Sequence, residues 1–236
     1  EEHAEQVSAV LPEDAVFHDL TLGGGTPMIL SPKQLEKVVD MAEHYFGFRR
    51  EEGEIVIETS PNQTTPEKLA LLKELCVNRV SIGVQSFHDR ELKSLYRTHC
   101  ADAARRALHD IRQTGFDCVN LDLIYGIPGQ TMESLEASLN EAISFAPDEI
   151  FIYPLYVKPG TLLHRNGVKC SKEALEMQKM VREILKNAGY HPHSMRRFAK
   201  KEVSFSSCGF GNTISIGCGG RSYVGNLHFC EPYAVG

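Results

Sequence analysis

The sequence lacks the features that mark membrane-spanning, secreted and nucleic-acid-binding proteins. Its 236 residues contain no apolar run near the ~20 residues that a transmembrane helix needs, and no signal peptide is visible. Its 25 Lys and Arg are scattered and outnumbered by 31 Asp and Glu, which gives a net charge of −6 rather than a basic face for nucleic acid. We therefore expect neither a membrane nor a nucleic acid as a partner.

Closely spaced cysteines are also absent. The chain has seven cysteines, an odd number, and no two of them stand at a metal-ligand spacing such as C-x-x-C. Cys208, Cys218 and Cys230 lie in the tail, but their separations of ten and twelve residues are weak support for a metal site. Ordinary thiols in a reducing compartment are the expected state, so we predict a cytoplasmic protein.

What is present is an ordinary globular composition with alternating strand-like and helix-like segments. The hydrophobic share of 42% and the charged share of 24% suit one domain, or a large domain with an appendage. Short β-branched, apolar runs predict strands, and amphipathic segments behind a Ser or Thr cap predict helices. The expected strands are residues 16–20, 54–59, 79–84, 118–125, 149–157, 191–199 and a short one at 214–216; the expected helices are residues 33–46, 65–75, 101–114, 134–145 and 171–187.

This alternation predicts a parallel sheet covered by helices, either as a barrel or as an open doubly wound sheet. The barrel is favoured because polar residues stand at or just after the carboxyl ends of successive strands, where a β/α barrel gathers them at one site. These residues are Gly24 to Thr26, Glu58, Gln85, Asp122 and Tyr156. An open sheet would bring only one or two of them together. The alternative for each is that it caps a neighbouring helix or pairs with Lys or Arg.

The glycine run at residues 23–25 follows the first expected strand and precedes a helix whose N-cap is Ser31. Consecutive glycines at the end of a strand let the backbone come within hydrogen-bonding distance of a ligand. A tight turn is the plain alternative, and a phosphate site in an unrelated barrel enzyme is another.

Several motifs occur together in an order that resembles a known enzyme group. The chain is similar to radical S-adenosylmethionine (SAM) enzymes of the oxygen-independent coproporphyrinogen III oxidase type. The matching stretches are GGGTP (23–27), IETSP (57–61), NRVSIGVQSF (78–87), YRTH (96–99), NLDLIYGIPGQT (120–131) and VKPGT (157–161). The pairing of RVSIGVQSF with DLIYGIPGQT is the most specific part of the resemblance, which covers most of residues 16–165.

The resemblance implies an α/β fold: a partial (β/α)6, TIM-like barrel of the radical SAM type with a C-terminal extension. It also implies a [4Fe–4S] cluster chelated by SAM, and reductive cleavage of SAM to a 5′-deoxyadenosyl radical that abstracts a substrate hydrogen. Carboxylates suit the ammonium and hydroxyl groups of SAM, and an arginine suits its carboxylate. The positions that match SAM contacts are Gly24, Gly25 and Thr26 along its methionine end, the polar side chains of Glu58, Gln85, Arg97 and Asp122, and a backbone contact at Tyr156.

One part of the family pattern is missing. The family binds its cluster through C-x-x-x-C-x-x-C just after the first strand, and no such motif stands in this sequence. We therefore expect the first β/α unit and the cluster ligands upstream of residue 1, and a chain that does not hold the cluster alone. A fragment is favoured over a degenerate member, because the SAM-contact positions keep the expected residue types. Residues 1–167 are the expected radical SAM core, and residues 168–236 a truncated C-terminal extension.

The expected function is radical SAM catalysis of the coproporphyrinogen oxidase kind, by oxidative decarboxylation or related chemistry such as methyl transfer. The alternative is a haem-binding chaperone on the same scaffold, without decarboxylase activity. The expected partners are a small-molecule substrate, with a porphyrin as one candidate, and an electron donor such as flavodoxin or ferredoxin. Candidates for receiving an acidic substrate are Arg196, Arg197 and Arg221, with solvated or structurally paired arginines as the alternative. Candidate haem ligands are His99, His191, His193 and His228.

Overall fold

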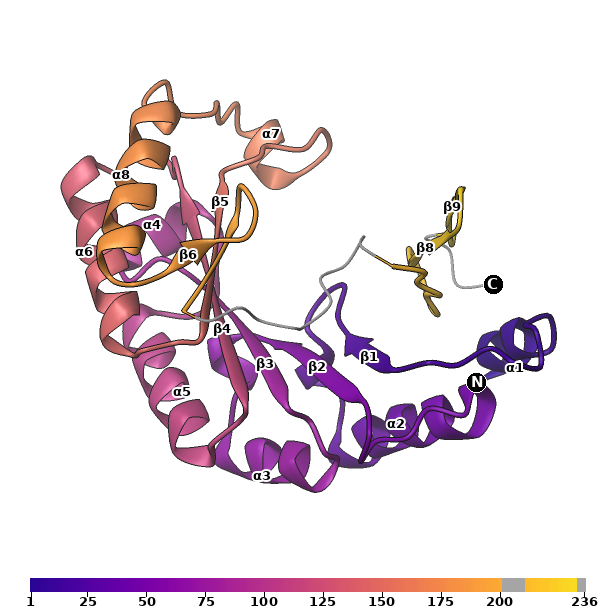
Figure 1. Cartoon of the computed structure of the whole chain (residues 1–236). Coiled ribbons are helices and arrows are strands. Elements are labelled where there is room, and N and C mark those ends of the chain that lie inside the picture. Colours follow the sequence, from indigo (N-terminus) through magenta and orange to yellow (C-terminus); the bar gives the residue numbers. More distant parts are fainter. Residues whose placement is uncertain (201–210, 233–236) are drawn as a thin grey trace.

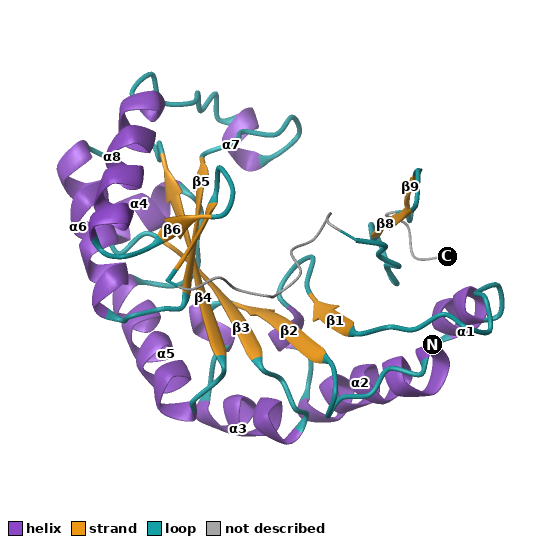
Figure 2. Cartoon of the chain, viewed as in Figure 1, coloured by secondary structure: helices purple, strands orange, loops and turns teal. Residues whose placement is uncertain are grey.

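The computed structural model describes residues 1–200 and 211–232 of the chain. Figures 1 and 2 show a curved sheet with helices on its convex side and a separate two-stranded hairpin. The strands are β1 (Asp19–Leu22), β2 (Glu54–Thr59), β3 (Arg79–Gln85), β4 (Cys118–Tyr125), β5 (Glu149–Pro154), β6 (His191–Pro192), β7 (Arg197–Ala199), β8 (Arg221–Val224) and β9 (Leu227–Cys230). The helices are α1 (Glu2–Ser8), α2 (Pro32–Phe46), α3 (Pro66–Glu74), α4 (Asp89–Ser94), α5 (Ala101–Thr114), α6 (Met132–Ser144), α7 (Leu162–Arg165) and α8 (Ala174–Asn187), with short 3-10 turns η1 (Pro27–Ile29) and η2 (Pro61–Gln63).

The main sheet has the strand order β1-β2-β3-β4-β5-β7-β6. The first five strands are parallel neighbours in chain order, whereas β7 pairs antiparallel with both β5 and β6. A doubly wound sheet reverses its strand order at a switch point and carries helices on both faces. Here the order does not reverse from β1 to β5, and helices α2, α3, α5 and α6 line the outer face (Figure 1). The predicted α/β fold with a partial, unclosed barrel is therefore confirmed.

Local signals in the sequence place the helices. The Ser31 side chain accepts a hydrogen bond from the Gln34 backbone, and the Gln34 side chain accepts one from the Ser31 backbone, so α2 starts with a capping box. Thr65 caps α3 through its side chain. Helix α5 ends at Gly115, whose φ of 73° lies in the left-handed region that favours glycine. These ends orient each helix so that its apolar stripe faces the sheet.

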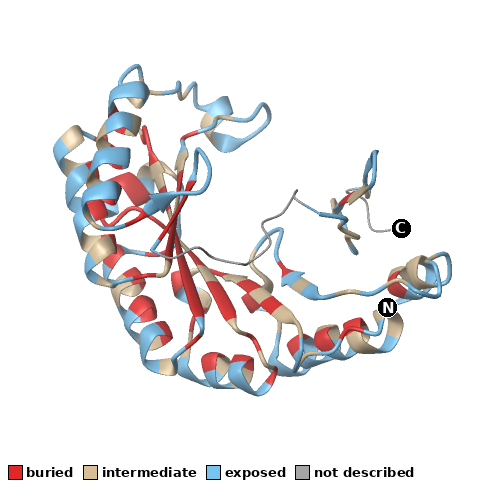
Figure 3. Cartoon of the chain, in the orientation of Figure 1, coloured by how far each residue is buried: buried red, intermediate tan, exposed pale blue. Residues whose placement is uncertain are grey.

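The two faces of the sheet differ in chemistry (Figure 3). On the outer face, aliphatic strand residues are almost fully buried under the helices: Ile55, Ile57, Val80, Ile82, Leu121 and Leu123. Burying each such side chain contributes roughly 1.5–3 kcal/mol. The alternate positions of the same strands face inward and are largely polar: Glu54, Glu58, Arg79, Ser81, Asn120 and Asp122. Since desolvating polar groups is costly, the inner face is where a ligand site is expected.

Three segments differ from the sequence prediction. The first expected strand, residues 16–20, is displaced toward β1, which lies at an open edge of the sheet, and Val16 is 71% exposed. Residues 191–199 form two short antiparallel strands, β6 and β7, instead of one strand. Residues 214–216 are not a strand, and the tail pairs instead through β8 and β9. The short helices α1, α4 and α7 were not expected, because too few residues repeat an apolar face.

The sheet continues beyond the expected boundary at residue 167. Helix α8 packs against α6, and β7 pairs with β5. The tail hairpin contacts the other end of the chain, where the Gly217 backbone N–H donates to His3 Nδ1 at 3.2 Å. The division into a core and an extension stays a prediction. Among the helices of the described residues, none has the length and apolarity that crossing a membrane requires.

Candidate functional site

The glycine run after β1 folds around a carboxylate of the neighbouring strand. The backbone N–H of Gly24 donates to Glu58 Oε2 at 3.1 Å. A Cβ on Gly23 would come within 2.9 Å of the Glu58 carboxyl carbon, so glycine leaves the room that this side chain occupies. Gly24 itself has a φ of 82°, which also favours glycine. The run therefore brings a strand-end carboxylate and an open backbone together.

Asp122 is the second carboxylate at this end of the sheet. It lies on β4, opposite Gly83 of β3, with Glu58 on the far side of β3. Burial raises the pKa of Asp122 to about 7, and the charge of Glu58 adds to this shift. Burial also raises the pKa of Glu58, against the lowering effect of the Gly24 N–H. Two partly buried carboxyls with raised pKa values favour a ligand that brings positive charge.

Arg97, in the segment after α4, lies near this carboxylate pair. Its positive charge lowers the pKa of Asp122, while burial lowers the pKa of Arg97 itself. Arg97 also lines a cavity that neither Glu58 nor Asp122 lines. A guanidinium in that position can bind a ligand carboxylate through two parallel hydrogen bonds.

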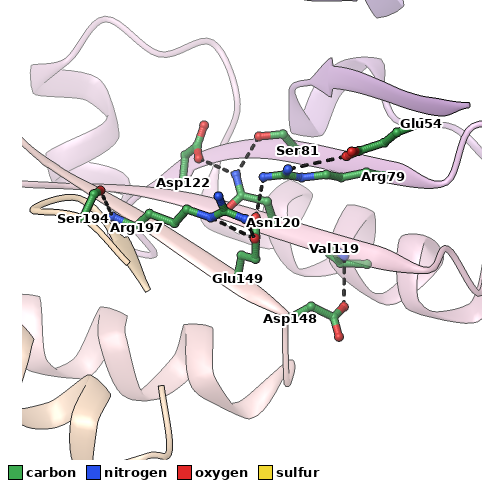
Figure 4. A network of polar contacts seen from close by, with 10 residues as sticks. All are labelled: Glu54, Arg79, Ser81, Val119, Asn120, Asp122, Asp148, Glu149, Ser194 and Arg197. Carbon is green, nitrogen blue, oxygen red and sulfur yellow. Dashed lines mark hydrogen bonds and ion pairs between the residues drawn. The ribbon is translucent and has the colours of Figure 1, made fainter. Parts of the chain in front are cut away.

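Asn120 holds Asp122 in place (Figure 4). Its Nδ2 donates to Asp122 Oδ1 at 2.8 Å and to Ser81 Oγ at 2.7 Å. The hydrogen bond to Asp122 lowers the pKa of that carboxyl and so offsets part of the effect of burial. The sequence analysis missed Asn120, although its position two residues before Asp122 puts both side chains on one face of β4.

Gln85 ends β3 in a strained conformation. Its φ of 72° lies in the left-handed region that residues other than glycine rarely adopt. The register of β3 against β4 shifts between Gly83 and Gln85. The Gln85 amide nitrogen would lie 2.7 Å from a Cβ on Gly83, so the side chain folds back over that glycine, which is the partner of Asp122. Strain of this kind costs about 1–3 kcal/mol and is concentrated at functional sites.

A cavity of about 750 Å³ opens between the ends of β4 and β5. This volume suits a small organic ligand. Two predicted site residues line it, Arg97 and Tyr156, and the Tyr156 side chain is 70% exposed. Arg196, one candidate for an acidic substrate, also lines it and lies 5.6 Å from the Tyr153 ring centre. The sequence analysis did not assign three further lining residues, Tyr96, Tyr153 and Lys158.

Gly25 and Thr26 complete the turn after β1. Gly25 is exposed, and Thr26 is half-buried at the start of η1. The Thr26 side chain makes no capping hydrogen bond to η1, so its hydroxyl is open to another partner. The structure thus gathers Gly24, Glu58, Gln85, Arg97 and Asp122 at one end of the sheet, while their roles toward SAM stay a prediction.

The three candidate arginines of the tail have different surroundings. Arg197 is 6% exposed and its Nε donates to Glu149 Oε1 at 3.0 Å, so the structurally paired alternative holds for it (Figure 4). Arg196 borders the cavity, as the acidic-substrate hypothesis requires. Arg221 is exposed on β8, outside the lining of the cavity.

The four candidate haem ligands also differ in their burial. His99 is buried, its Nε2 lies 3.0 Å from the Val84 carbonyl oxygen, and burial lowers its pKa. That nitrogen is therefore engaged with the backbone instead of facing a ligand. His191, His193 and His228 are exposed. They retain the accessibility that a haem ligand needs; His191 lies on β6, His193 follows it, and His228 lies on β9.

The described residues do not fit a [4Fe–4S] cluster. Within residues 1–200 and 211–232, no group of three or more His, Cys, Asp or Glu could hold a metal ion. Burial raises the pKa of the Cys118 thiol to about 12, which opposes the thiolate form that binds iron. In the tail, Cys218 and Cys230 are exposed, and Cys208 lies outside the described residues.

Comparisons with known proteins agree with this geometry. The sequence profile of the Radical SAM superfamily matches residues 1–142. The heme chaperone HemW of Bacillus subtilis (strain 168) is 33% identical over 214 residues, which cover 86% of this chain and 56% of that protein. The oxygen-independent coproporphyrinogen III oxidase of Pseudomonas aeruginosa is 31% identical over 238 residues, which cover 98% of this chain and 51% of that protein.

Solved structures include a similar fold. The coproporphyrinogen III oxidase HemN from Escherichia coli, a radical SAM enzyme, matches with a TM-score of 0.85 at 23% identity, over 99% of this chain and 59% of that chain. At this level of identity the likeness concerns the fold, and it agrees with the partial barrel. The chain spans about half the length of the curated relatives it matches.

Proposed function

The chain belongs to the radical SAM superfamily, and on this premise we propose that it binds SAM across the carboxyl ends of β1 to β4. The observation that carries the proposal is the half-buried carboxylate pair of Glu58 and Asp122, of which Glu58 accepts a hydrogen bond from the glycine run. Each carboxyl has a raised pKa, so the pair is stabilised by a ligand that brings a cation. The ammonium group of SAM meets that requirement, and its hydroxyl groups can donate hydrogen bonds to the same carboxylates.

The other predicted residues receive complementary roles in this proposal. Arg97 binds the carboxylate of SAM, and the turn at Gly24, Gly25 and Thr26 offers backbone groups and a hydroxyl to its methionine end. Gln85 offers an amide beside Asp122, and the backbone at Tyr156 borders the adenosine end. When bound at a cluster, SAM supplies a one-electron cleavage that starts radical chemistry. The residues of this chain bind SAM, orient it and keep water from it.

The [4Fe–4S] cluster belongs to the proposal for the whole protein and not to the described residues. No group of metal ligands stands among them, and we derive no step through the cluster. The predicted location of the cluster ligands is upstream of residue 1, where the family pattern puts its three cysteines. A flavodoxin or ferredoxin is the proposed electron donor, and the cytoplasm the proposed location.

For the substrate we favour an anionic, flat molecule such as a porphyrin. The cavity beside Arg97 is lined by three tyrosines, and Lys158 and Arg196 add positive charge. Aromatic rings stack on a flat ligand, and the cations pair with its carboxylates. Coproporphyrinogen-oxidase-like decarboxylation, or related chemistry such as methyl transfer, is the first candidate activity. A haem-binding chaperone is the second, because a similar relative is a heme chaperone.

Calorimetric titration of SAM into the chain tests the binding site. Asp122→Ala and Glu58→Ala should each lower the affinity at least about tenfold, since each removes a charge-assisted contact. Glu176→Ala is the matched control, because Glu176 is an exposed residue of α8 paired only with Lys179 of the same helix. Unchanged affinity in both site variants would remove the carboxylate pair from the proposal.

A second experiment separates the two candidate activities. The protein extended upstream to include the predicted cysteines is reconstituted without oxygen and given SAM and a reductant. Formation of 5′-deoxyadenosine supports a radical SAM enzyme, whereas stable haem binding without SAM cleavage supports the chaperone. Absence of a cluster in the extended protein would contradict the cofactor assignment.

A further inference from the structure

We propose that Glu91 is a positioning residue that holds the loops after β3 and β4 in register with each other. The SAM-related consequence rests on the proposed function, whereas the positioning of the two loops does not. Glu91 lies on α4, is 2% exposed, and is not among the residues that line the cavity. It therefore acts through other residues and does not touch the ligand.

The Glu91 carboxylate receives hydrogen bonds from three different segments. Ser86 Oγ donates to its Oε2 at 2.6 Å from the loop after β3. Gln130 Nε2 donates to the same oxygen at 2.9 Å from the loop after β4. Ser134 Oγ donates to Oε1 at 2.6 Å from the first turn of α6. One buried carboxylate thus joins two strand-end loops and a helix.

Gln130 passes this restraint to the backbone after β4. Its Oε1 accepts from the N–H groups of Gly126 and Ile127, at 2.7 and 3.3 Å. Its Nε2 also contacts the Ile124 carbonyl oxygen at 3.4 Å. Ile124 and Gly126 line the cavity, so the amide of Gln130 shapes one wall of it from behind. Because Glu91 fixes which end of this amide is the donor, it fixes which end meets the two N–H groups.

Ser86 passes the same restraint to the loop after β3. It directly follows Gln85, whose positive φ is a conformation that its surroundings must hold. The Ser86 hydroxyl, besides donating to Glu91, accepts from the His88 backbone N–H at 3.0 Å. A change at Glu91 therefore reaches Gln85 through one residue and the cavity wall through Gln130.

The contacts also predict a double variant that restores the hydrogen bond between positions 91 and 130. In Gln130→Glu two carboxylates face each other, whereas in Glu91→Gln the amide oxygen can still accept from Gln130 while its nitrogen turns to the Ser134 hydroxyl. In the double variant, Glu91→Gln with Gln130→Glu, the donor and the acceptor exchange places, and the new carboxylate still accepts from Gly126 and Ile127. The Ser86 hydroxyl can act as acceptor as well as donor, so it tolerates the exchange.

Hydrogen exchange of the 236-residue chain tests the positioning without any ligand. Exchange at the Gly126 and Ile127 amides should speed up at least about tenfold in Gln130→Glu, change little in Glu91→Gln, and return close to the original rate in the double variant. The matched control is Tyr190→Phe, which removes a buried hydrogen bond to the Pro147 carbonyl, far from these loops, and should leave both amides unchanged. Unchanged exchange in Gln130→Glu, or no recovery in the double variant, overturns the proposal.

SAM titration of the same variants tests the link to the site. Affinity should fall about tenfold in Gln130→Glu and recover in the double variant, following the exchange rates. Recovery of affinity by an exchange of two buried groups is not expected from general damage to the fold. If the original chain itself does not bind SAM, the proposed function fails while the exchange rates still decide the role of Glu91. If variants that change the exchange rates leave the SAM affinity unchanged, the positioning is unrelated to SAM and that part of the proposal is wrong.

Discussion

At the amino ends of the strands Glu149 is buried between Arg79 and Arg197, whereas at the carboxyl ends Glu58 and Asp122 are half-buried on the two strands that flank β3. The first arrangement supplies each buried charge with an opposite charge from the protein (Figure 4). In the second arrangement burial raises the pKa of both carboxyls, and the charge of Glu58 raises the pKa of Asp122 further. A buried charge that the protein itself neutralises serves the fold, while one that it leaves to a ligand serves the site.

Glu54 is an intermediate case. It faces Arg79 at 3.7 Å from the amino end of β2, yet burial raises its pKa to about 7. A nearby cation therefore does not by itself make a buried carboxylate an ordinary ion-pair partner. The contrast between Glu149 and Asp122 depends on close hydrogen bonding as well as on charge.

The largest effect on stability is expected from breaking the ion pairs at the amino ends. Glu149→Ala leaves Arg79 and Arg197 without the carboxylate that both contact, and should cost about 3–5 kcal/mol of unfolding free energy. This corresponds to a fall of roughly 10 °C in Tm, measured by calorimetry. Glu176→Ala removes an exposed pair and should change the free energy by less than about 0.5 kcal/mol. Equal effects of the two variants would refute the assignment of Glu149 to the fold.

Substitution of Asp122 is expected to raise the unfolding free energy, in contrast to substitution of Glu149. Its folded-state pKa of about 7 lies above the unfolded value, so its ionisation opposes folding as the pH rises from about 4 to about 7. Asp122→Asn should therefore raise the unfolding free energy at pH 8 by on the order of 2 kcal/mol, and the gain should shrink as the pH falls toward 4. Denaturant unfolding at several pH values measures this. A variant that is less stable at pH 8 would mean that the protein neutralises Asp122 after all.

A smaller stability effect with a large binding effect is expected at Gly23. A Cβ there would lie 2.9 Å from the Glu58 carboxyl carbon and push that side chain away. Gly23→Ala should lower SAM affinity about tenfold while the unfolding free energy changes by less than about 1 kcal/mol. Gly211→Ala is the control, because nothing lies within 4 Å of a Cβ at that position and Gly211 is not among the predicted SAM contacts. Equal affinities of the two variants would contradict a role for the Gly23–Glu58 contact.

The smallest stability effect is expected at the cavity rim. Arg196→Ala removes an exposed guanidinium that contacts the Tyr153 ring, and should change the unfolding free energy by no more than about 0.5 kcal/mol. Binding of a porphyrin with carboxylate side chains, followed by absorbance, should nevertheless weaken several-fold. Binding as strong as in the unchanged chain would remove Arg196 from the proposed substrate contacts.

Much of the fold can be predicted from the sequence because its central strands are unambiguous. The bounds of β2 and β4 agree with the expected residues 54–59 and 118–125, since β-branched and apolar residues fill them and turn residues flank them. The expected strand at 149–157 ends early, at Pro154, because proline cannot donate to the ladder. The edge strand β1 was misplaced because an edge position does not require a buried run.

Some residues of the candidate site could likewise be predicted from the sequence, and others could not. The strand-end positions of Glu58 and Asp122 predict that the two side chains meet, because parallel strands of known order fix their register. Glu91 was not predicted, since its partners come from three segments and no spacing within α4 distinguishes a buried glutamate from a solvated one. Gly23 differs from its two neighbours only through the side chain that packs on it, which the sequence does not reveal.

The most direct test of the carboxylate pair is the pH dependence of SAM binding by the chain. Because a bound cation favours ionised carboxylates, SAM should displace a proton from Asp122 below its pKa of about 7. Calorimetry in buffers of different ionisation enthalpy should detect proton release at pH 6, little release at pH 8, and an affinity that rises between them. In Asp122→Asn both effects should be lost or greatly reduced. Affinity that is independent of pH, or a pH dependence that the Asn variant retains in full, would contradict the assignment of this pair to a cationic ligand.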